Sequence, residues 1–553
     1  MNKNQHKRSA FSGKIGFVLS AAGASVGLGN IWRFPYLAAK YGGGIFLLIY
    51  IILAFTFGYT MIVAETALGR MTRKSPVGAF AAVRKGERSF GGWINAIIPI
   101  LIVPYYSVIG GWVIRYLADY ISGHGSELAT DGYFSAFISS GASAEICFVL
   151  FTIFTLAIIF AGVRNGVERV SKVMMPILVV LSVIIAGYSV TRPGALEGVK
   201  YFLVPNLSNF SWMTVVTAMG QMFYSLSIAM GILVTFGSYM KKDVSIEEST
   251  ENVEIFDTAI AIMAGLMIIP AVFSFSGGDP DTLQAGPALM FITIPKVFES
   301  MGLGTVVGIL FFTLVLFAAV TSSIALTESA VSTFEDELGW NRKQATVLIG
   351  IIMLVLGSLS ALGYGPLARF TVFGMQFLDF FDFLTNSVMM PIAAITTCLL
   401  VSRVIGVEKI EEEVTLEGKP FRRKRIFNFM IKYLCPTLRG RHPHQLGGKR
   451  AGRHLHVSRQ QNALEAFTPL PALFLCPFQD ALYLVQILYK INAALPLGGW
   501  TAPSRPCGPA ELSARRSSRR GHRGCRARPD GPARPWTSPR RSLPAYRCRR
   551  GTR

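Results

Sequence analysis

Long runs of apolar residues dominate the chain, and polar residues gather between these runs instead of alternating with them. A helix needs about 20 mostly apolar residues to cross the hydrocarbon core of a bilayer. By this measure the sequence predicts ten membrane-spanning helices, near residues 14–37, 43–70, 92–122, 145–162, 167–189, 214–240, 251–274, 302–335, 344–362 and 371–402. We therefore expect an all-α polytopic membrane protein, because a helix satisfies its own backbone hydrogen bonds inside lipid.

The overall composition agrees with a membrane protein. Hydrophobic residues make up 51% of the chain and charged residues only 16%, whereas soluble domains carry about 25% charged residues. This composition excludes a disordered chain, a coiled coil and an ordinary soluble enzyme. The seven cysteines have neither the spacing of a zinc site nor that of a disulfide framework.

Most Lys and Arg residues between the predicted spans fall on segments that lie inside the cell if the N-terminus is cytoplasmic. This is the distribution that the positive-inside rule favours. The basic N-terminus leads into an apolar run that is too long for a cleavable signal and has no small-residue cleavage site. We expect a multi-pass protein of the inner (plasma) membrane with a cytoplasmic N-terminus.

The chain divides into two parts of different character. Residues 1–436 hold the predicted spans, whereas residues 437–553 hold 22 Lys and Arg against 4 Asp and Glu. Such an arm can bind nucleic acid or anionic lipid. We favour the other interpretation, an atypical, disordered or non-native tail on a transporter body, because nothing in the membrane part calls for a nucleic-acid partner.

Two of the predicted spans carry a polar, glycine-containing interruption near their middle. The interruptions are residues 23–30 (GASVGLGN) and 224–231 (YSLSIAMG), in the first and the sixth span. Glycine weakens a helix interior, and backbone freed at this depth must face protein or a wet cavity. Close helix packing would explain the glycines alone, but not the neighbouring Asn30, Ser225 and Ser227.

A pair of interrupted helices at matching places in two halves of a chain indicates the central site of a transporter. Unwound segments expose carbonyl oxygens, which suit a small hard cation such as Na⁺. The half-helix N-termini beyond the breaks expose N–H groups, which suit a carboxylate. An amino acid, with one carboxylate and one ammonium group, matches both ends of such a site.

Several of these segments resemble the neurotransmitter:sodium symporter family, over roughly residues 8–435. The segments are FSGKIGFVLSAAGASVGLGNIWRFPYLAAKYGGG (11–44), Tyr105-Tyr106, GQMFYSLSIAMG (220–231), AGPALMFITIP (285–295), FAAVTSSIAL (317–326) and LDFFDF (378–383). The resemblance is to bacterial amino-acid members with eleven spans. It implies the LeuT-type fold, a 5+5 inverted repeat with broken helices 1 and 6, here with ten spans and a truncated eleventh that begins near 425–436.

The resemblance implies two sodium sites built from oxygen ligands. The first would use the Ser25 carbonyl and the side chains of Asn30, Ser225 and Asp257. The second would use the carbonyls of Gly23, Val26 and Ala318 with the hydroxyls of Thr321 and Ser322. Chloride-dependent relatives have a neutral side chain at the position of Asp257, so this carboxylate predicts that chloride is not required. The alternative for Asp257 is a solvated acid near the cytoplasmic end of its helix.

The resemblance also implies a substrate pocket and two gates. The pocket residues are Ser25, Gly27, Ile102, Tyr106, Tyr224, Ser225, Ser227, Met230, Ser322 and Leu326, with the Tyr106 hydroxyl donating to the substrate carboxylate. The pocket is mostly apolar, which favours a hydrophobic or aromatic amino acid. Arg33 with Asp382 would form the outer gate, and Arg8 with Asp336 the inner one.

We therefore predict sodium-coupled symport of a neutral amino acid into the cell by alternating access. An ion channel and a non-translocating amino-acid sensor are the alternatives on the same fold. We do not expect an enzyme, because the sequence offers no Ser/His/Asp or metal constellation. Two acids keep open roles. Glu65 is expected to hydrogen-bond around the first sodium site, and its alternative is a structural buried acid bonded to nearby backbone; these two roles do not exclude each other. Glu328 either faces a wet cavity or links two helices.

Overall fold

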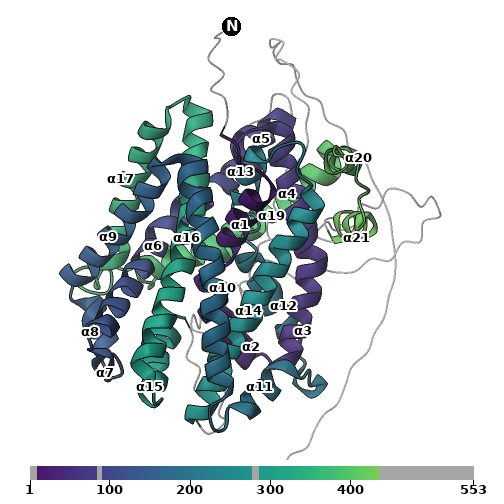
Figure 1. The fold of residues 1–553 in the computed structure, drawn as a ribbon. Helices are drawn as coiled ribbons and strands as arrows, with labels where there is room; N and C mark the ends of the chain where they lie inside the picture. Colours follow the sequence, from purple (N-terminus) through teal and green to yellow (C-terminus); the bar gives the residue numbers. More distant parts are fainter. Residues whose placement is uncertain (1–8, 84–89, 277–285, 435–553) are drawn as a thin grey trace, which may run out of the picture. The chain divides into compact units, whose positions relative to one another are not determined.

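The computed structural model describes residues 9–83, 90–276 and 286–434, which all belong to one compact unit. The predicted boundary at residue 436 and the tail 437–553 lie outside the described residues, as does Arg8. The regular elements of the described chain are helices, and these residues contain no strand beyond isolated bridges (Figure 1).

Every predicted span contains helix in the structure. The main helices are α1 (Lys14–Ser25), α2 (Phe34–Lys40), α3 (Gly44–Leu53), α4 (Tyr59–Thr72), α6 (Phe90–Ile121), α9 (Ala142–Phe160), α10 (Arg169–Val190), α12 (Trp212–Ser225), α13 (Ile232–Tyr239), α14 (Ile246–Ser276), α16 (Gly304–Leu338), α17 (Arg342–Leu362), α18 (Phe377–Asp382) and α19 (Met390–Leu399). Shorter helices are α5 (Pro76–Val83), α7 (Gly125–Leu128), α8 (Tyr133–Ser139), α11 (Ala195–Leu203), α15 (Ile294–Glu299), α20 (Val407–Val414) and α21 (Lys424–Phe429).

Several spans run through a π-helical turn instead of one regular helix. The π-helices are η1 (Gly29–Arg33), η2 (Ala54–Gly58), η3 (Val163–Glu168), η6 (Leu289–Thr293), η7 (Phe383–Met389), η8 (Leu400–Ile405) and η9 (Met430–Leu434), and η4 (Leu207–Asn209) is a 3₁₀ turn. The described start of the predicted eleventh helix is therefore α21 with η9. Such π turns widen a helix locally and often occur at functional sites.

Among the described residues, eight helices are long and apolar enough to cross a membrane, and the bent pair Lys14–Ser25 and Gly29–Lys40 makes a ninth. The remaining predicted span, the sixth (214–240), is present as α12 and α13, and each of these is shorter than a full span. These observations confirm the predicted polytopic all-α fold class.

The two interrupted spans lie at the centre of the helix assembly. Helix α1 packs against α10, α14 and α16, and α13 packs against α4; Figure 1 shows α1 and α13 between α16 and α4. Side chains that the sequence places in apolar runs are accordingly buried around both breaks, such as Leu28, Ile31, Ile228 and Ile232. The breaks thus meet in protein and not in lipid, as backbone at membrane depth requires.

A fully buried arginine ties the C-terminal end of α4 to the chain after the last described span. The Arg70 side chain is 0% exposed, and its Nε lies 2.7 Å from Glu413 Oε1. Its Nη1 donates to the Val244 carbonyl at 2.6 Å, and its Nη2 donates to the Glu413 carbonyl. All three nitrogens of the guanidinium group therefore have partners, as a buried charge requires.

We expect the substitution Arg70→Gln to lower the free energy of unfolding by about 3–5 kcal/mol, because it leaves the Glu413 carboxylate buried and unpaired. Chemical denaturation in detergent measures the change. Arg164→Gln, which removes an exposed cation, is the matched control. Equal stability of the two variants would contradict the expectation.

Candidate functional site

The first span breaks immediately after Ser25. Val26 leaves the helical conformation (φ −77°, ψ 93°), and the helix resumes at η1 with a bend of 53°. Gly27 lies in the break because there is no room for a side chain: a Cβ atom would lie 2.6 Å from Ser322 Oγ and 3.0 Å from the Tyr106 hydroxyl.

The sixth span breaks between Ser225 and Ile232. Ser227 and Ala229 adopt left-handed conformations (φ 53° and 60°), and Gly231 does the same (φ 72°). Residues other than glycine rarely adopt this conformation, and strain of this kind clusters at functional sites.

Two contacts hold the second break in place. The Ala229 N–H donates to Glu65 Oε1 at 2.9 Å, and the Ser227 hydroxyl donates to the Ala24 carbonyl at 3.0 Å. The contact that the structure shows for Glu65 is therefore a hydrogen bond to backbone, and it lies at the second break itself. The Ser227 bond joins the two breaks directly.

Polar side chains from four spans converge beside the breaks. Asn30 Nδ2 donates to Ser225 Oγ at 2.9 Å and to Asp257 Oδ1 at 2.8 Å. The Ser225 hydroxyl also donates to Asp257 Oδ1, at 2.8 Å. The Asp257 carboxylate, 0% exposed, accepts in addition from the Tyr50 hydroxyl at 2.8 Å. The structure therefore brings the predicted side chains of the first sodium site together, with Asp257 fully buried instead of solvated.

Ser25 also belongs to this region. It is buried, and its hydroxyl oxygen has no hydrogen-bond partner among the described residues. Buried hydroxyl groups normally have a partner. The unpaired Ser25 hydroxyl oxygen lies at the end of α1, where the helix breaks, and a bound cation would satisfy such a buried oxygen.

The residues of the second predicted sodium site also converge. Ser322 Oγ lies 3.3 Å from the Gly23 carbonyl oxygen and 3.4 Å from the Val26 carbonyl oxygen. Thr321 Oγ1 lies 3.2 Å from the Ala318 carbonyl oxygen. The site is tight, because a Cβ atom at position 23 would lie 3.2 Å from Thr321 Cβ.

Both clusters offer oxygen ligands. In the described part of the chain, no three or more His, Cys, Asp or Glu side chains gather as metal ligands. Carbonyl, hydroxyl and amide oxygens with a single carboxylate form a set that suits a hard monovalent ion and not a transition metal.

A cavity lies between the two breaks; the empty space in it, including its open side, is about 340 Å³. Nine of the ten predicted pocket residues line it: Ser25, Gly27, Ile102, Tyr106, Tyr224, Ser227, Met230, Ser322 and Leu326. Ser225 does not line it and instead bonds to Asn30 and Asp257. Ala24, Leu28, Gly29, Asn30 and Ile232 complete the lining.

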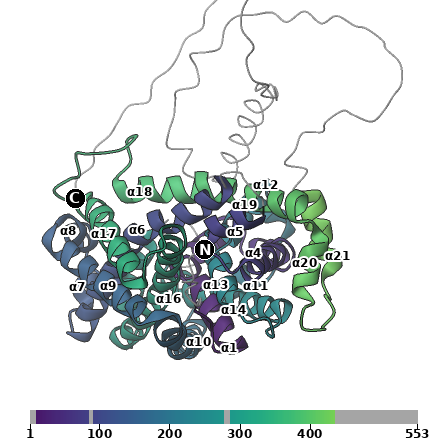
Figure 2. The ribbon, with the colours of Figure 1, turned by 90° about the horizontal axis from the view of Figure 1, so that it is seen from above.

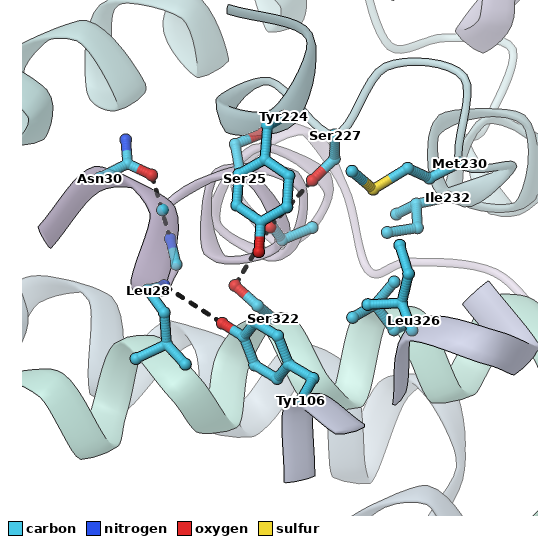
Figure 3. Close-up of a pocket in the computed structure, with 14 residues that line it drawn as sticks. Ser25, Leu28, Asn30, Tyr106, Tyr224, Ser227, Met230, Ile232, Ser322 and Leu326 are labelled. Atoms are coloured by element: carbon cyan, nitrogen blue, oxygen red, sulfur yellow. Dashed lines mark hydrogen bonds between the residues drawn. The ribbon is translucent and has the colours of Figure 1, made fainter. Parts of the chain in front are cut away.

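The cavity has one polar end and one apolar end. Figure 3 shows Met230, Ile232 and Leu326 at one end, and Asn30, Leu28 and Tyr106 at the other. The Leu28 N–H donates to the Tyr106 hydroxyl at 3.2 Å. Because this oxygen accepts from the backbone, its own proton is available to a carboxylate in the cavity.

The predicted outer gate residues lie on one side of the cavity without closing it. The Arg33 guanidinium lies over the Tyr224 ring, 5.2 Å from its centroid. Asp382 is exposed and accepts from Asn386 at 2.6 Å and from Tyr105 at 3.2 Å. Arg33 attracts Asp382 electrostatically, but no ion pair within 4 Å joins them among the described contacts.

The opposite side of the cavity is closed. Phe11 is 1% exposed, and its ring packs edge-on against Phe17, Phe236 and Tyr239. The Phe11 N–H donates to the Tyr239 carbonyl at 3.1 Å. Of the predicted inner gate, only Asp336 is described, and it accepts from the Ser75 N–H at 2.5 Å.

The structure also settles the role left open for Glu328. Its buried carboxylate accepts from Arg342 and, at 2.8 Å, from the Tyr239 hydroxyl. Arg342 Nε donates to the Ile159 carbonyl at 2.8 Å. Glu328 therefore links α16 to α13, to the start of α17 and to the end of α9, and is not a free acid in a cavity.

Sequence reasoning missed three polar contributors to the site. Tyr50 donates to Asp257 from an apolar run in which its hydroxyl is an isolated polar group. Gln221 Nε2 donates to the Gly29 carbonyl at 3.1 Å, and the N–H of Leu28 binds Tyr106. Tyr50 and Gln221 could have been found from the sequence, because each is a polar residue within an apolar span. The hydrogen bond from the Leu28 N–H to Tyr106 could not, because it depends on where the helix breaks.

Two broken helices that meet at buried oxygen clusters beside a cavity define a secondary transporter. The model of the sodium:neurotransmitter symporter family matches residues 8–126 and 135–439. The chain belongs to this family, whose members are sodium-coupled transporters and multi-pass membrane proteins.

Relatives and a solved structure agree with this assignment. The sodium-dependent transporter YhdH of Bacillus subtilis is 35% identical, over 78% of this chain and 96% of the relative. A sodium-dependent transporter of Haemophilus influenzae is 32% identical, over 79% of this chain and 98% of the relative. The crystal structure of MhsT in complex with L-phenylalanine is similar, with a TM-score of 0.71, 34% identity, and coverage of 78% of this chain and 98% of that one.

Proposed function

We propose that this protein couples the entry of Na⁺ to the uptake of a neutral amino acid with an apolar or aromatic side chain. The observation that carries the proposal is the meeting of the two breaks: the Ser227 hydroxyl bonds to the Ala24 carbonyl across them at 3.0 Å. Oxygen clusters and a cavity adjoin this contact, so an ion and a zwitterion would share one site.

The cavity lining supports the class of substrate. Tyr106 and the N–H groups near the first break would bind the carboxylate, and the exposed carbonyls with Ser227 would bind the ammonium group. Ile102, Met230 and Leu326 would surround the side chain, and a flexible methionine adapts to substrates of different shape. The lining holds no charged residue, so a charged side chain would remain unpaired.

We propose two sodium ions per cycle. One would bind between Asn30 and Asp257, and the other between Val26 and Ser322. Asp257 supplies a fixed negative charge beside the first ion, which supports transport without chloride. One charge that moves inward through a potential of 100 mV releases about 2.3 kcal/mol, so the potential and the sodium gradient both drive uptake.

The cycle would proceed by alternating access. External Na⁺ and the amino acid bind while the outer gate is open and the Phe11 cluster closes the inner side. Arg33 and Asp382 then close above the substrate, and the inner side opens to the cytoplasm, where Na⁺ is scarce. We place the protein in the cytoplasmic membrane with its N-terminus inside.

Uptake into proteoliposomes tests this function. We expect saturable uptake of L-phenylalanine that requires an inward Na⁺ gradient, persists without chloride and is inhibited by apolar and aromatic amino acids among the twenty. Conductance without saturable uptake would support a channel, and binding without flux would support a sensor. Preferred inhibition by acidic or basic amino acids would contradict the proposed pocket.

We expect Gly27→Ala to weaken sodium-dependent L-phenylalanine binding about 10-fold or more. The added methyl group would overlap Ser322 Oγ and press on the Tyr106 hydroxyl, and overpacking of this kind costs about 1–3 kcal/mol. Equilibrium binding of the radiolabelled amino acid measures the effect. Gly187→Ala, at a position with no atom within 4 Å of the added carbon, should bind normally; equal affinities in the two variants would refute the tight fit.

A further inference from the structure

The segment after the last described span folds back over the ends of α4 and α14. We call residues 407–429 the strap; it consists of α20, α21 and the loop between them. Figures 1 and 2 show α20 and α21 beside α4 at the edge of the helix assembly, and both helices contact α4. Val407, Ile410 and Val414 are buried on one face of α20.

The first half of the strap is anchored by a buried ion pair. Glu413, near the end of α20, holds the buried Arg70 through its carboxylate and its carbonyl. The same guanidinium group binds the Val244 carbonyl just before α14. An ion pair with a fully buried partner does not open readily, so α20 has a fixed position on α4 and on the start of α14.

The second half of the strap binds the acidic first turns of α14. The Glu247 carboxylate accepts from the backbone N–H groups of Arg422 at 2.9 Å and of Arg423 at 2.8 Å. Arg423 Nη1 lies 3.0 Å from Glu254 Oε2, and Arg423 Nε lies 3.4 Å from Glu251 Oε1. The strap therefore fixes this end of α14 from two sides.

Glu248, the next acid on α14, connects the strap to the first broken helix. One of its oxygens lies 2.7 Å from Lys14 Nζ, and the other lies 2.5 Å from Lys419 Nζ. Lys14 is the first residue of α1, and Lys419 belongs to the loop of the strap. The three side chains are 41%, 29% and 52% exposed for Lys14, Glu248 and Lys419, so these pairs can open and close in water.

Lys14 connects the Glu248 ion pairs to the site through helix α1. Helix α1 runs without interruption from Lys14 to Ser25, so its 12 residues move as one rod of about 18 Å. A displacement at Lys14 thus changes the position of Ser25 at the site. In the described structure the inner side is closed, with Phe11 buried.

We propose that the strap is a positioning element for transport, which holds α1 in the inward-closed position through the shared carboxylate of Glu248. The strap fixes α14, Lys419 fixes one oxygen of Glu248, and the other oxygen then restrains Lys14. This inference rests on the proposed alternating-access function. It assigns to the strap a role in the equilibrium between outward-facing and inward-facing states, beyond that of connecting two spans.

Distances between two spin labels on the full-length chain, measured by double electron–electron resonance spectroscopy, test the inference. Spin labels are placed at the exposed positions Ile15 on α1 and Lys343 on α17, in a background without native cysteines. At a sub-saturating Na⁺ concentration we expect Glu248→Gln to raise the ratio of inward-open to closed molecules about threefold to tenfold, as the loss of two half-exposed ion pairs implies. Saturating Na⁺ should restore the closed state, which a merely damaged protein would not show.

Two further variants make the outcome decisive. Lys419→Gln should shift the ratio in the same direction by a smaller factor, and it removes only an exposed side chain, so the protein will fold. Glu412→Gln, which removes another exposed acid of the strap, should leave the ratio unchanged. The proposal would be overturned if Glu248→Gln and Glu412→Gln showed the same ratio of inward-open to closed molecules. It would also be overturned if Lys419→Gln left this ratio unchanged. Absence of sodium-dependent uptake by the wild type would instead refute the transport function.

Discussion

Replacement of Asp257 by Asn should weaken Na⁺ binding about 100-fold in chloride-free medium. The Asp257 carboxylate is fully buried and accepts hydrogen bonds from Asn30, Ser225 and Tyr50. It is the negative charge that would offset the first sodium ion. Loss of one member of a buried charge pair costs about 2–5 kcal/mol, a range that contains the roughly 2.7 kcal/mol of a 100-fold change.

Chloride should partly restore function in this variant, because a mobile anion can occupy the place of the missing fixed charge. The measurement is the Na⁺ concentration for half-maximal amino-acid uptake, with chloride and with gluconate. Asp243→Asn, which removes an exposed acid just before α14, is the control and should behave as the wild type. Full activity of Asp257→Asn without chloride would contradict the proposed role of the carboxylate.

The substitution Tyr106→Phe should weaken amino-acid binding about 10-fold to 100-fold. In the proposed site the hydroxyl would donate to the substrate carboxylate, and a hydrogen bond to a charged group contributes about 1.5–3 kcal/mol. The substitution also removes the acceptor of the Leu28 N–H. Both losses fall on the site, so Na⁺-dependent binding of L-phenylalanine should weaken while the fold persists.

A matched tyrosine separates this effect from a general loss of hydroxyl groups. The Tyr188 hydroxyl on α10 is buried and has no hydrogen-bond partner among the described residues, so Tyr188→Phe should change binding less than twofold. Similar affinities of Tyr106→Phe and the wild type would show that the carboxylate binds elsewhere.

The sequence predicted the spans and the two breaks because both depend on local features. A run of about 20 apolar residues determines a span, and glycines with polar neighbours mark where a helix is interrupted. The positions of Asn30, Ser225 and Asp257 were inferred from a family resemblance, and their convergence depends on how three separate spans pack. No local pattern in this chain contains that information.

Other features depended on side-chain contacts between distant segments and could not be predicted. The residues around Glu328 gave no indication that Arg342 and Tyr239 would share its carboxylate. Three consecutive acids such as Glu411–Glu413 are typical of a solvated face, yet Glu413 holds the buried Arg70. The left-handed conformations of Ser227 and Ala229 could not be predicted either, because neither residue type favours this conformation.

The central claim is that the two breaks meet to bind a sodium ion beside a zwitterionic amino acid. A high-resolution structure determined with Na⁺ and L-phenylalanine tests it most directly. We predict ion density between Asn30 and Asp257 and between Val26 and Ser322, with the substrate carboxylate next to the Tyr106 hydroxyl and its ring towards Met230. Amino-acid density outside this cavity, or an intact helix through either break, would contradict the account.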